Sequence, residues 1–197
     1  LERRQLPNET ALQLAKLAEA EMIKNVDAQP RNVRHHSFLT NLYLNMVYVD
    51  KSVLEKNIEL LDSAIPLSPT RTHLYYSLGR SYINKQDKDK AIEAFETAVE
   101  LSPKVYDAHL NMIAAFATFG EDEAALTHIE TIAESLERPL TVTEWSRLAE
   151  VFQLLKRLPV ALTVLDEALV HYPDAPELYK QKAVYHIGNS QREDAMQ

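Results

Sequence analysis

The chain has 197 residues, a formal charge of −8 and no cysteine. This negative charge argues against a general binder of nucleic acid or anionic membranes, because such proteins neutralise phosphates with a basic face. The absence of cysteine excludes disulfides, thiolate catalysis and thiolate metal sites, but it leaves the cell compartment open. With only 3 glycines and no nucleotide-binding or nucleophile-elbow motif, we expect no cofactor, no metal and no catalytic residue.

Prolines divide the chain at regular intervals. They recur after 39, 34, 36 and 34 residues, at Pro30, Pro69, Pro103, Pro139 and Pro173. Proline cannot continue a helix, so this spacing predicts a series of helical units, each ending near a proline. Apolar residues recur at intervals of three and four within the units, which predicts helices and no strands.

The first predicted element is a long amphipathic helix over residues 8–26. Its apolar stripe comprises Leu12, Leu14, Ala15, Leu17, Ala18, Met22 and Ile23. We assign residues 1–32 to this lone helix and expect it to complete a pair whose first half precedes Leu1. The chain lacks an initiator Met and a signal peptide, so we interpret it as a fragment. Its apolar windows are shorter than the roughly 18 residues of a membrane-spanning helix, so we expect no membrane insertion by this fragment.

Residues 33–71 form a long, degenerate unit. Its apolar positions are Leu39, Tyr43, Val47, Ile58, Leu61 and Ala64. The clearest unit follows at residues 72–105. The residues that define its pattern are Tyr75, Leu78, Gly79 and Tyr82 on a first helix, and Ala91, Phe95 and Ala98 on a second. A small residue such as Gly79 lets two antiparallel helices approach, and bulky residues fill the space around the contact.

Three further units follow. Residues 106–141 form a weaker copy, residues 142–175 a close copy, and residues 176–197 a truncated one. In the close copy the offsets of residues 72–105 recur without a shift. The matching residues are Trp145, Leu148, Ala149, Phe152, Ala161, Leu165, Ala168 and Pro173.

These residues resemble the tetratricopeptide repeat, which has this pattern at a 34-residue period. The resemblance implies an all-α fold, a right-handed superhelical solenoid of antiparallel helix pairs covering residues 1–197. It also implies a protein-interaction module that binds a peptide or a partner helix on its concave face.

The first helix of each pair lines the concave wall in this family. The expected binding residues are His73, Tyr76, Arg80, Asn84, Asp107, Leu110, Asn111, Arg147, Glu150 and Lys180. Ala114, Thr143, Ser146 and Glu177 lie on the same predicted wall. The alternative for each is an ordinary solvated residue. Tyr76 and Arg80 are the residue types most often found as interface hot spots. They replace the Lys and Asn with which chaperone-docking members of the family clamp a carboxylate, so we expect no such clamp.

Neither the histidines nor the acidic clusters indicate a metal site or a catalytic site. The seven histidines contain no His-x-x-x-His pair, which favours partly exposed helix residues over a metal site. Arg31, Arg34, His35 and His36 form a small basic patch whose natural ligand would be an anionic group. The acidic residues near positions 87–89 and 121–123 are expected to stabilise the starts of second helices.

Residues 12–103 also resemble a subset of these repeats, the soluble C-terminal domains of bacterial O-antigen ligase or polymerase family proteins. This second resemblance rests on four segments: a long helix, the turn at 29–32, the stretch at 60–71 and the near-consensus repeat. This resemblance implies a domain outside the cytoplasmic membrane, and it adds a glycan acceptor or a membrane partner to the expected partners. The alternatives are a free-standing cytoplasmic adaptor or assembly factor, and an enzyme domain with a cryptic site between units.

Overall fold

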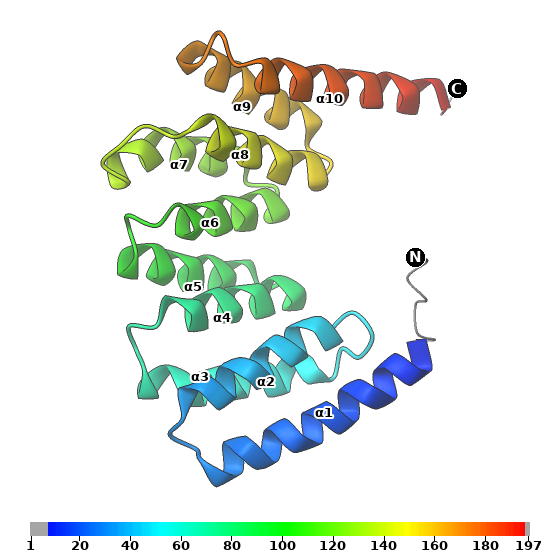
Figure 1. Cartoon of the computed structure of the whole chain (residues 1–197), viewed down its shortest axis with the longest axis vertical. Helices are drawn as coiled ribbons and strands as arrows, with labels where there is room; N and C mark the ends of the chain where they lie inside the picture. The colour runs from blue at the N-terminus through cyan, green and yellow to red at the C-terminus, as the bar shows by residue number, and fades with distance from the viewer. Residues whose placement is uncertain (1–7, 196–197) are drawn as a thin grey trace. The chain divides into compact units, whose positions relative to one another are not determined.

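Helices are the only regular secondary structure in residues 8–195, which are the residues described by the computed structural model, and this range contains no strand. The helices form antiparallel pairs joined by short turns (Figure 1). Both observations confirm the predicted fold class. The helices group into two compact units, unit 1 at residues 1–101 and unit 2 at residues 102–197. None of the described helices is both long and apolar enough to cross a bilayer.

Unit 1 begins with a single long helix and continues with two helix pairs. Its helices are α1 (Asn8–Ala28), α2 (Val33–Met46), α3 (Val53–Ala64), α4 (Thr72–Lys85) and α5 (Lys88–Leu101). Asn32 caps α2 by accepting a hydrogen bond from the Arg34 amide at 3.2 Å. Pro30 and Pro69 lie in the turns before α2 and α4, where a residue without an amide proton ends one helical run before the next begins.

Only part of the predicted apolar stripe on α1 is packed. One edge of α1 lies against a cluster formed by α2 and the start of α3. The packed residues are Leu12, Ala15, Met22 and Val26. Leu14 and Leu17 remain 52% and 66% exposed. A partly buried ion pair also holds α1 in place, because Glu19 accepts hydrogen bonds from the Tyr43 hydroxyl at 3.2 Å and from Lys56 Nζ at 2.8 Å.

The α4–α5 contact shows why glycine stands at position 79. Phe95 is 1% exposed, and a Cβ added at Gly79 would lie 2.6 Å from its Cε2 atom. Real side chains do not approach so closely, so the phenyl ring occupies the space that any other residue would need. The predicted pairing of a small residue with a bulky one is therefore confirmed at this contact.

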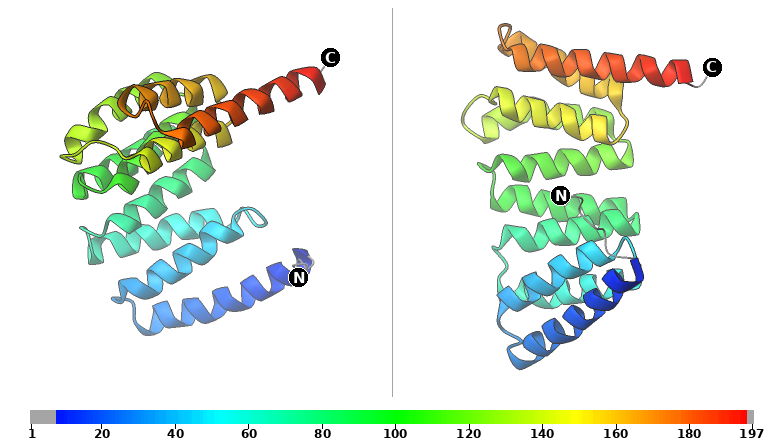
Figure 2. Two further views of the ribbon diagram at one scale, coloured as in Figure 1. Left: turned by 45° about the horizontal axis from the view of Figure 1, so that its top comes forward. Right: turned by 45° about the vertical axis from the view of Figure 1, so that its right-hand side comes forward.

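Unit 2 contains two helix pairs and a long final helix. Its helices are α6 (Tyr106–Phe119), α7 (Asp122–Ser135), α8 (Val142–Leu154), α9 (Leu158–His171) and α10 (Pro176–Ala195). One core runs through them, and Trp145, Leu148, Phe152, Leu165 and Ala168 are buried in it. α10 extends beyond its neighbour α9 in both views of Figure 2.

Acidic residues lie at the starts of the second helices, as predicted. Asp89 is in the first turn of α5, and Asp122 and Glu123 are in the first turn of α7. Carboxylates there face the positive end of the helix dipole and stabilise it. Asp122 also pairs with Arg157, which lies in the turn just before α9. The repeat boundaries and a continuous superhelix stay predictions.

Candidate functional site

α4 presents four of the expected binding residues, His73, Tyr76, Arg80 and Asn84. Arg80 and Asn84 are exposed, whereas Tyr76 is half-buried. The Asn84 side chain is held against the helix, because its Nδ2 donates to the Arg80 carbonyl at 2.9 Å. Burial and, to a smaller extent, the nearby Arg71 lower the pKa of His73, so Arg80 supplies the charge of this face at neutral pH.

α2 repeats this arrangement 39 residues earlier, which the sequence analysis missed. Arg34, Asn41 and Asn45 correspond to His73, Arg80 and Asn84 and are exposed. Asn45 Nδ2 donates to the Asn41 carbonyl at 2.7 Å, as Asn84 does in α4. The interval of 39 between Pro30 and Pro69 was the signal that could have revealed the correspondence.

Phe38 adds an exposed aromatic ring to the exposed polar residues of α2. Phe38 is 54% exposed, and its spacing places it on the same side of the helix as Arg34, Asn41 and Asn45. α2 and α4 contact each other, and Val33 of α2 shares a core cluster with Leu74 of α4. We name the combined surface the unit 1 strip. It comprises Arg34, Phe38, Asn41 and Asn45 of α2 with His73, Tyr76, Arg80 and Asn84 of α4.

In unit 2 the expected residues bind one another. Arg147 of α8 pairs with Asp107 of α6 at 2.9 Å, and its guanidinium lies 5.2 Å from the centre of the Tyr106 ring. Asn111 Nδ2 donates to the Asp107 carbonyl at 2.7 Å. The structure therefore brings together Asp107, Asn111 and Arg147, and their polar groups are largely satisfied within the unit.

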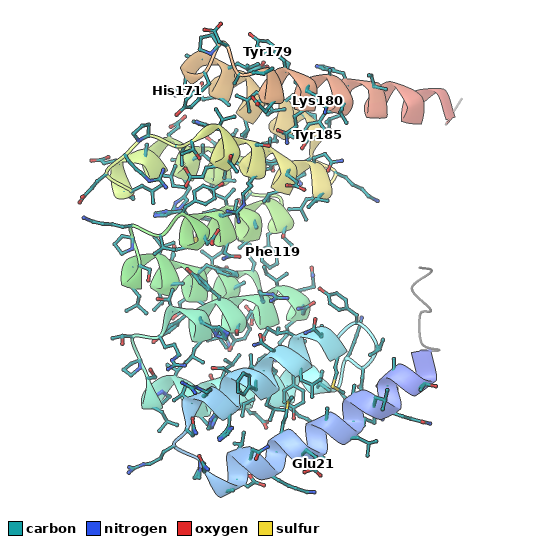
Figure 3. All side chains as sticks on the ribbon, in the orientation of Figure 1. Glu21, Phe119, His171, Tyr179, Lys180 and Tyr185 are labelled. Atoms are coloured by element: carbon teal, nitrogen blue, oxygen red, sulfur yellow. The ribbon has the colours of Figure 1, made fainter. Side chains whose placement is uncertain are left out.

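A second network joins α8 to α10. The Ser146 hydroxyl donates to Gln181 Oε1 at 2.7 Å, and Gln181 Nε2 donates to the Tyr185 hydroxyl at 2.8 Å. Burial raises the pKa of Tyr185, and Glu150 of α8 adds to the rise. Gln181 and Tyr185 were not predicted. Figure 3 labels Tyr185 on the side of α10 that faces α8, with Lys180 nearby.

The remaining expected residues of unit 2 have separate positions. Leu110 is half-buried and packs against the unit 2 core. Glu150 and Lys180 are exposed on α8 and α10. In the part of the chain that the structure describes, no hydrogen bond or ion pair joins these three residues into one site, and they stay predicted contacts.

The prediction of partly exposed histidines is wrong for two of them. His36 and His109 are almost completely buried. The carbonyl of Pro103 can only accept, so His109 donates to it through Nε2 at 2.7 Å. His109 Nδ1 then faces His128 Nε2 at 3.0 Å. Antiparallel packing of α6 and α7 creates this pair, which lies 19 residues apart in the chain. The described residues contain no group of three or more side chains suited to hold a metal.

Acid should destabilise unit 2 through His128. Burial, aided by His109, lowers the pKa of His128 from 6.5 to about 4. Below pH 6.5 the unfolded chain binds a proton that the folded chain does not bind, so stability falls between about pH 6.5 and 4 and then levels off. Because the ring is only partly buried, we expect a loss of about 2 kcal/mol.

Urea unfolding at about pH 7.5 and about pH 5 measures more than half of this loss. His128→Gln keeps a donor toward His109 without a titrating ring. Its stability should fall less between the two pH values than that of the unsubstituted chain. Equal falls would show that His128 does not carry the effect.

Comparisons with known proteins agree with this fold. Residues 72–105 match the family model of the tetratricopeptide repeat. No curated protein matches the chain in sequence. The chain is similar to the crystal structure of MamA, with 20% identity, a TM-score of 0.59, and coverage of 92% of this chain and 99% of that chain.

Two other solved structures are similar. TTC0263, a thermophilic TPR protein from Thermus thermophilus, has 18% identity, a TM-score of 0.57, and coverage of 90% of this chain and 93% of its own. YrrB, described as a TPR protein with an unusual peptide-binding site, has 18% identity, a TM-score of 0.53, and coverage of 88% of this chain and 86% of its own. At these identities the likeness shows the fold, which is that of tetratricopeptide-repeat proteins.

Proposed function

We propose that this chain, with a tetratricopeptide repeat at residues 72–105 and the fold of such proteins, is a protein-interaction module. Its binding surface is the unit 1 strip, and its ligand is a peptide segment or a helix of a partner protein. The similar protein YrrB is described as having a peptide-binding site. That description supports the class of ligand but not its position on this chain.

The difference between the two units carries the proposal. In unit 2, Arg147 is engaged by Asp107 and by the Tyr106 ring. In unit 1, the Arg34 and Arg80 side chains have no hydrogen-bonding or ion-pair partner among the residues that the structure describes. Exposed arginines without partners keep their five donors available for a ligand, whereas a paired arginine must first lose its partner.

The other strip residues suit a peptide. Asn45 and Asn84 each use one amide proton on their own helix, so each retains a second proton and an acceptor oxygen. An amide side chain can hydrogen-bond both groups of a peptide backbone. Asparagine is also a poor residue for a helix interior, so a binding role accounts for Asn41, Asn45 and Asn84 better than helix formation does. Phe38 supplies an exposed apolar contact.

Selection from a random peptide library displayed on phage tests this function. Clones retained by the immobilised chain should bind a variant with Tyr76→Ala and Arg80→Ala at least about tenfold more weakly, because hot-spot aromatic and arginine side chains contribute most of an interface. The variant should keep its helical circular dichroism. Arg147→Ala, which removes an exposed arginine of unit 2, is the matched control and should retain the clones. Failure to retain any clone, or equal retention by the double variant, would overturn the proposal.

The membrane-enzyme context and the absence of catalysis stay predictions. The family model and the three structures named above concern the repeat alone, and they add no support for a glycan or membrane partner. The native gene tests the context. A membrane glycan enzyme should encode many apolar stretches of about 20 residues upstream of Leu1, and a free-standing adaptor should encode none.

A further inference from the structure

We infer that the ligand of the unit 1 strip is an acidic peptide segment, an extended stretch with several Asp or Glu residues. This inference rests on the proposed function and names the chemistry of its partner. It depends on how charge is distributed over the helices of unit 1.

α2 and α4, the first helices of the two pairs in unit 1, contain no acidic residue. α2 and α4 have 14 residues each, and 29 of the 197 residues of the chain are Asp or Glu, so about four would be expected in these helices by composition. They carry instead Arg34, Arg80 and Lys85, together with three histidines. Soluble surfaces normally intersperse both signs of charge, so a surface free of one sign indicates a partner with that sign.

The acidic residues of unit 1 that the structure describes lie on α1, α3 and α5, or in the turns at Asp50 and Asp87. α3 carries Glu55, Glu59 and Asp62, and α5 carries Asp89, Glu93, Glu96 and Glu100. Of these, Glu55 reaches α4, where it pairs with Lys85 at 2.7 Å. Lys85 is therefore neutralised, and Arg34 and Arg80 supply the positive charge of the strip.

The turns that precede α2 and α4 add to this charge. Arg31 lies before α2 and Arg71 before α4, and both are exposed. The N-terminal ends of the two helices carry the positive end of the helix dipole, which also favours an anion. Two arginines therefore lie on the strip and two in the turns next to it, and guanidinium binds carboxylates through paired hydrogen bonds.

The charge of the whole chain does not oppose an acidic ligand here. Residues 1–101 hold 13 Lys or Arg and 14 Asp or Glu, whereas residues 102–197 hold 8 and 15. Unit 1 is thus nearly neutral, with a net charge of −1, and unit 2 carries −7 of the total. A nearly neutral unit with two arginines on the strip and two in the adjoining turns suits a short acidic peptide, but it lacks the extended basic surface that nucleic acid or an anionic membrane requires.

Sequencing the clones retained in the phage selection tests whether the ligand is acidic. Retained clones should hold at least about twice as many Asp and Glu residues as the unselected library. A fluorescent synthetic copy of a retained peptide then serves as the probe in a polarisation assay. Its affinity should fall by at least about tenfold when its acidic residues become Asn and Gln. The affinity should also weaken severalfold between about 50 and about 300 mM salt.

Charge reversal on the protein completes the test. Arg80→Glu should weaken the same probe by at least about tenfold, because it removes a partner and adds repulsion. Lys16→Glu is the matched control, since it makes the same change of charge at an exposed site on α1 and should alter the affinity by less than about twofold. Circular dichroism checks that both variants keep their fold.

The outcomes separate this inference from the proposed function. Peptides without excess acidity that lose binding on Tyr76→Ala but not on Arg80→Glu would overturn the acidic ligand and leave the proposed function standing. Peptides that bind all strip variants equally would overturn both. Binding of single-stranded DNA or of anionic vesicles with the affinity of the acidic peptide would also overturn the inference.

Discussion

Replacing Phe152 with alanine should lower the free energy of unfolding of unit 2 by about 3–5 kcal/mol, the usual cost of emptying a phenyl site in a close-packed core. Phe152 is completely buried in α8, in one cluster with Trp145, Leu148 and Leu165. These neighbours belong to α8 and α9, two antiparallel helices joined by a short turn, so we expect them to collapse only partly into the cavity. Urea unfolding followed by circular dichroism measures the loss.

Phe38→Ala is the matched control for Phe152→Ala. It removes the same atoms from a side chain that is 54% exposed, so the stability should change by less than about 1 kcal/mol. Because stacked helix pairs can unfold in more than one step, each transition should be fitted separately. Equal losses in the two variants would mean that Phe152 is not a core residue and that the register of α8 is wrong.

Replacing Gly79 with alanine should destabilise unit 1 by about 1–3 kcal/mol, although alanine is the better residue in a helix. The new Cβ would lie 2.6 to 2.8 Å from three atoms of the Phe95 ring. Phe95 is enclosed between α4 and α5 and cannot swing into solvent, so the two helices must separate. The overlap therefore outweighs the gain in helix propensity, and the midpoint of thermal unfolding should fall.

Two further variants isolate the cause of that loss. Gly188→Ala adds the same methyl group to α10, where no atom lies within 4 Å, so it should leave stability unchanged or raise it by up to about 1 kcal/mol. Combining Gly79→Ala with Phe95→Leu should recover part of the lost stability, because the smaller side chain makes room for the Cβ. If Gly79→Ala were as stable as Gly188→Ala, the close approach of α4 and α5 would be disproved.

The face of α4 could be predicted from the sequence because it depends only on helix periodicity. The match of Tyr75, Leu78 and Gly79 to a repeat predicts the side of α4 that packs on α5, where Gly79 is buried against Phe95. Tyr76 and Arg80 fall outside that side by helix periodicity. The exposed side of α2 also follows from helix periodicity. However, Arg34, Asn41 and Asn45 lie in a degenerate unit, where their correspondence to His73, Arg80 and Asn84 of α4 is hard to recognise. Its offset of 39 residues was present in the spacing of the prolines.

Pairings between helices could not be predicted in this way. Arg147 and Asp107 lie 40 residues apart, and His109 and His128 lie 19 apart. Their contact depends on the rotation and offset of one helix against another, which periodicity along a single helix does not specify. These pairings decide which polar residues are already satisfied. Among the side chains that the structure describes, they leave arginines without partners in unit 1 and none in unit 2.

The sequence by itself determined that the chain is helical, where its turns fall and which side of each helix is apolar. It could do so because proline geometry and the 3.6-residue period act over a few neighbouring residues. Only the tertiary structure decided that His109 is buried, that three of the seven residues of the α1 stripe stay exposed, and that a surface without acidic residues spans α2 and α4. Those features arise from contacts between segments distant in the chain, whose energies depend on the close packing of whole helices.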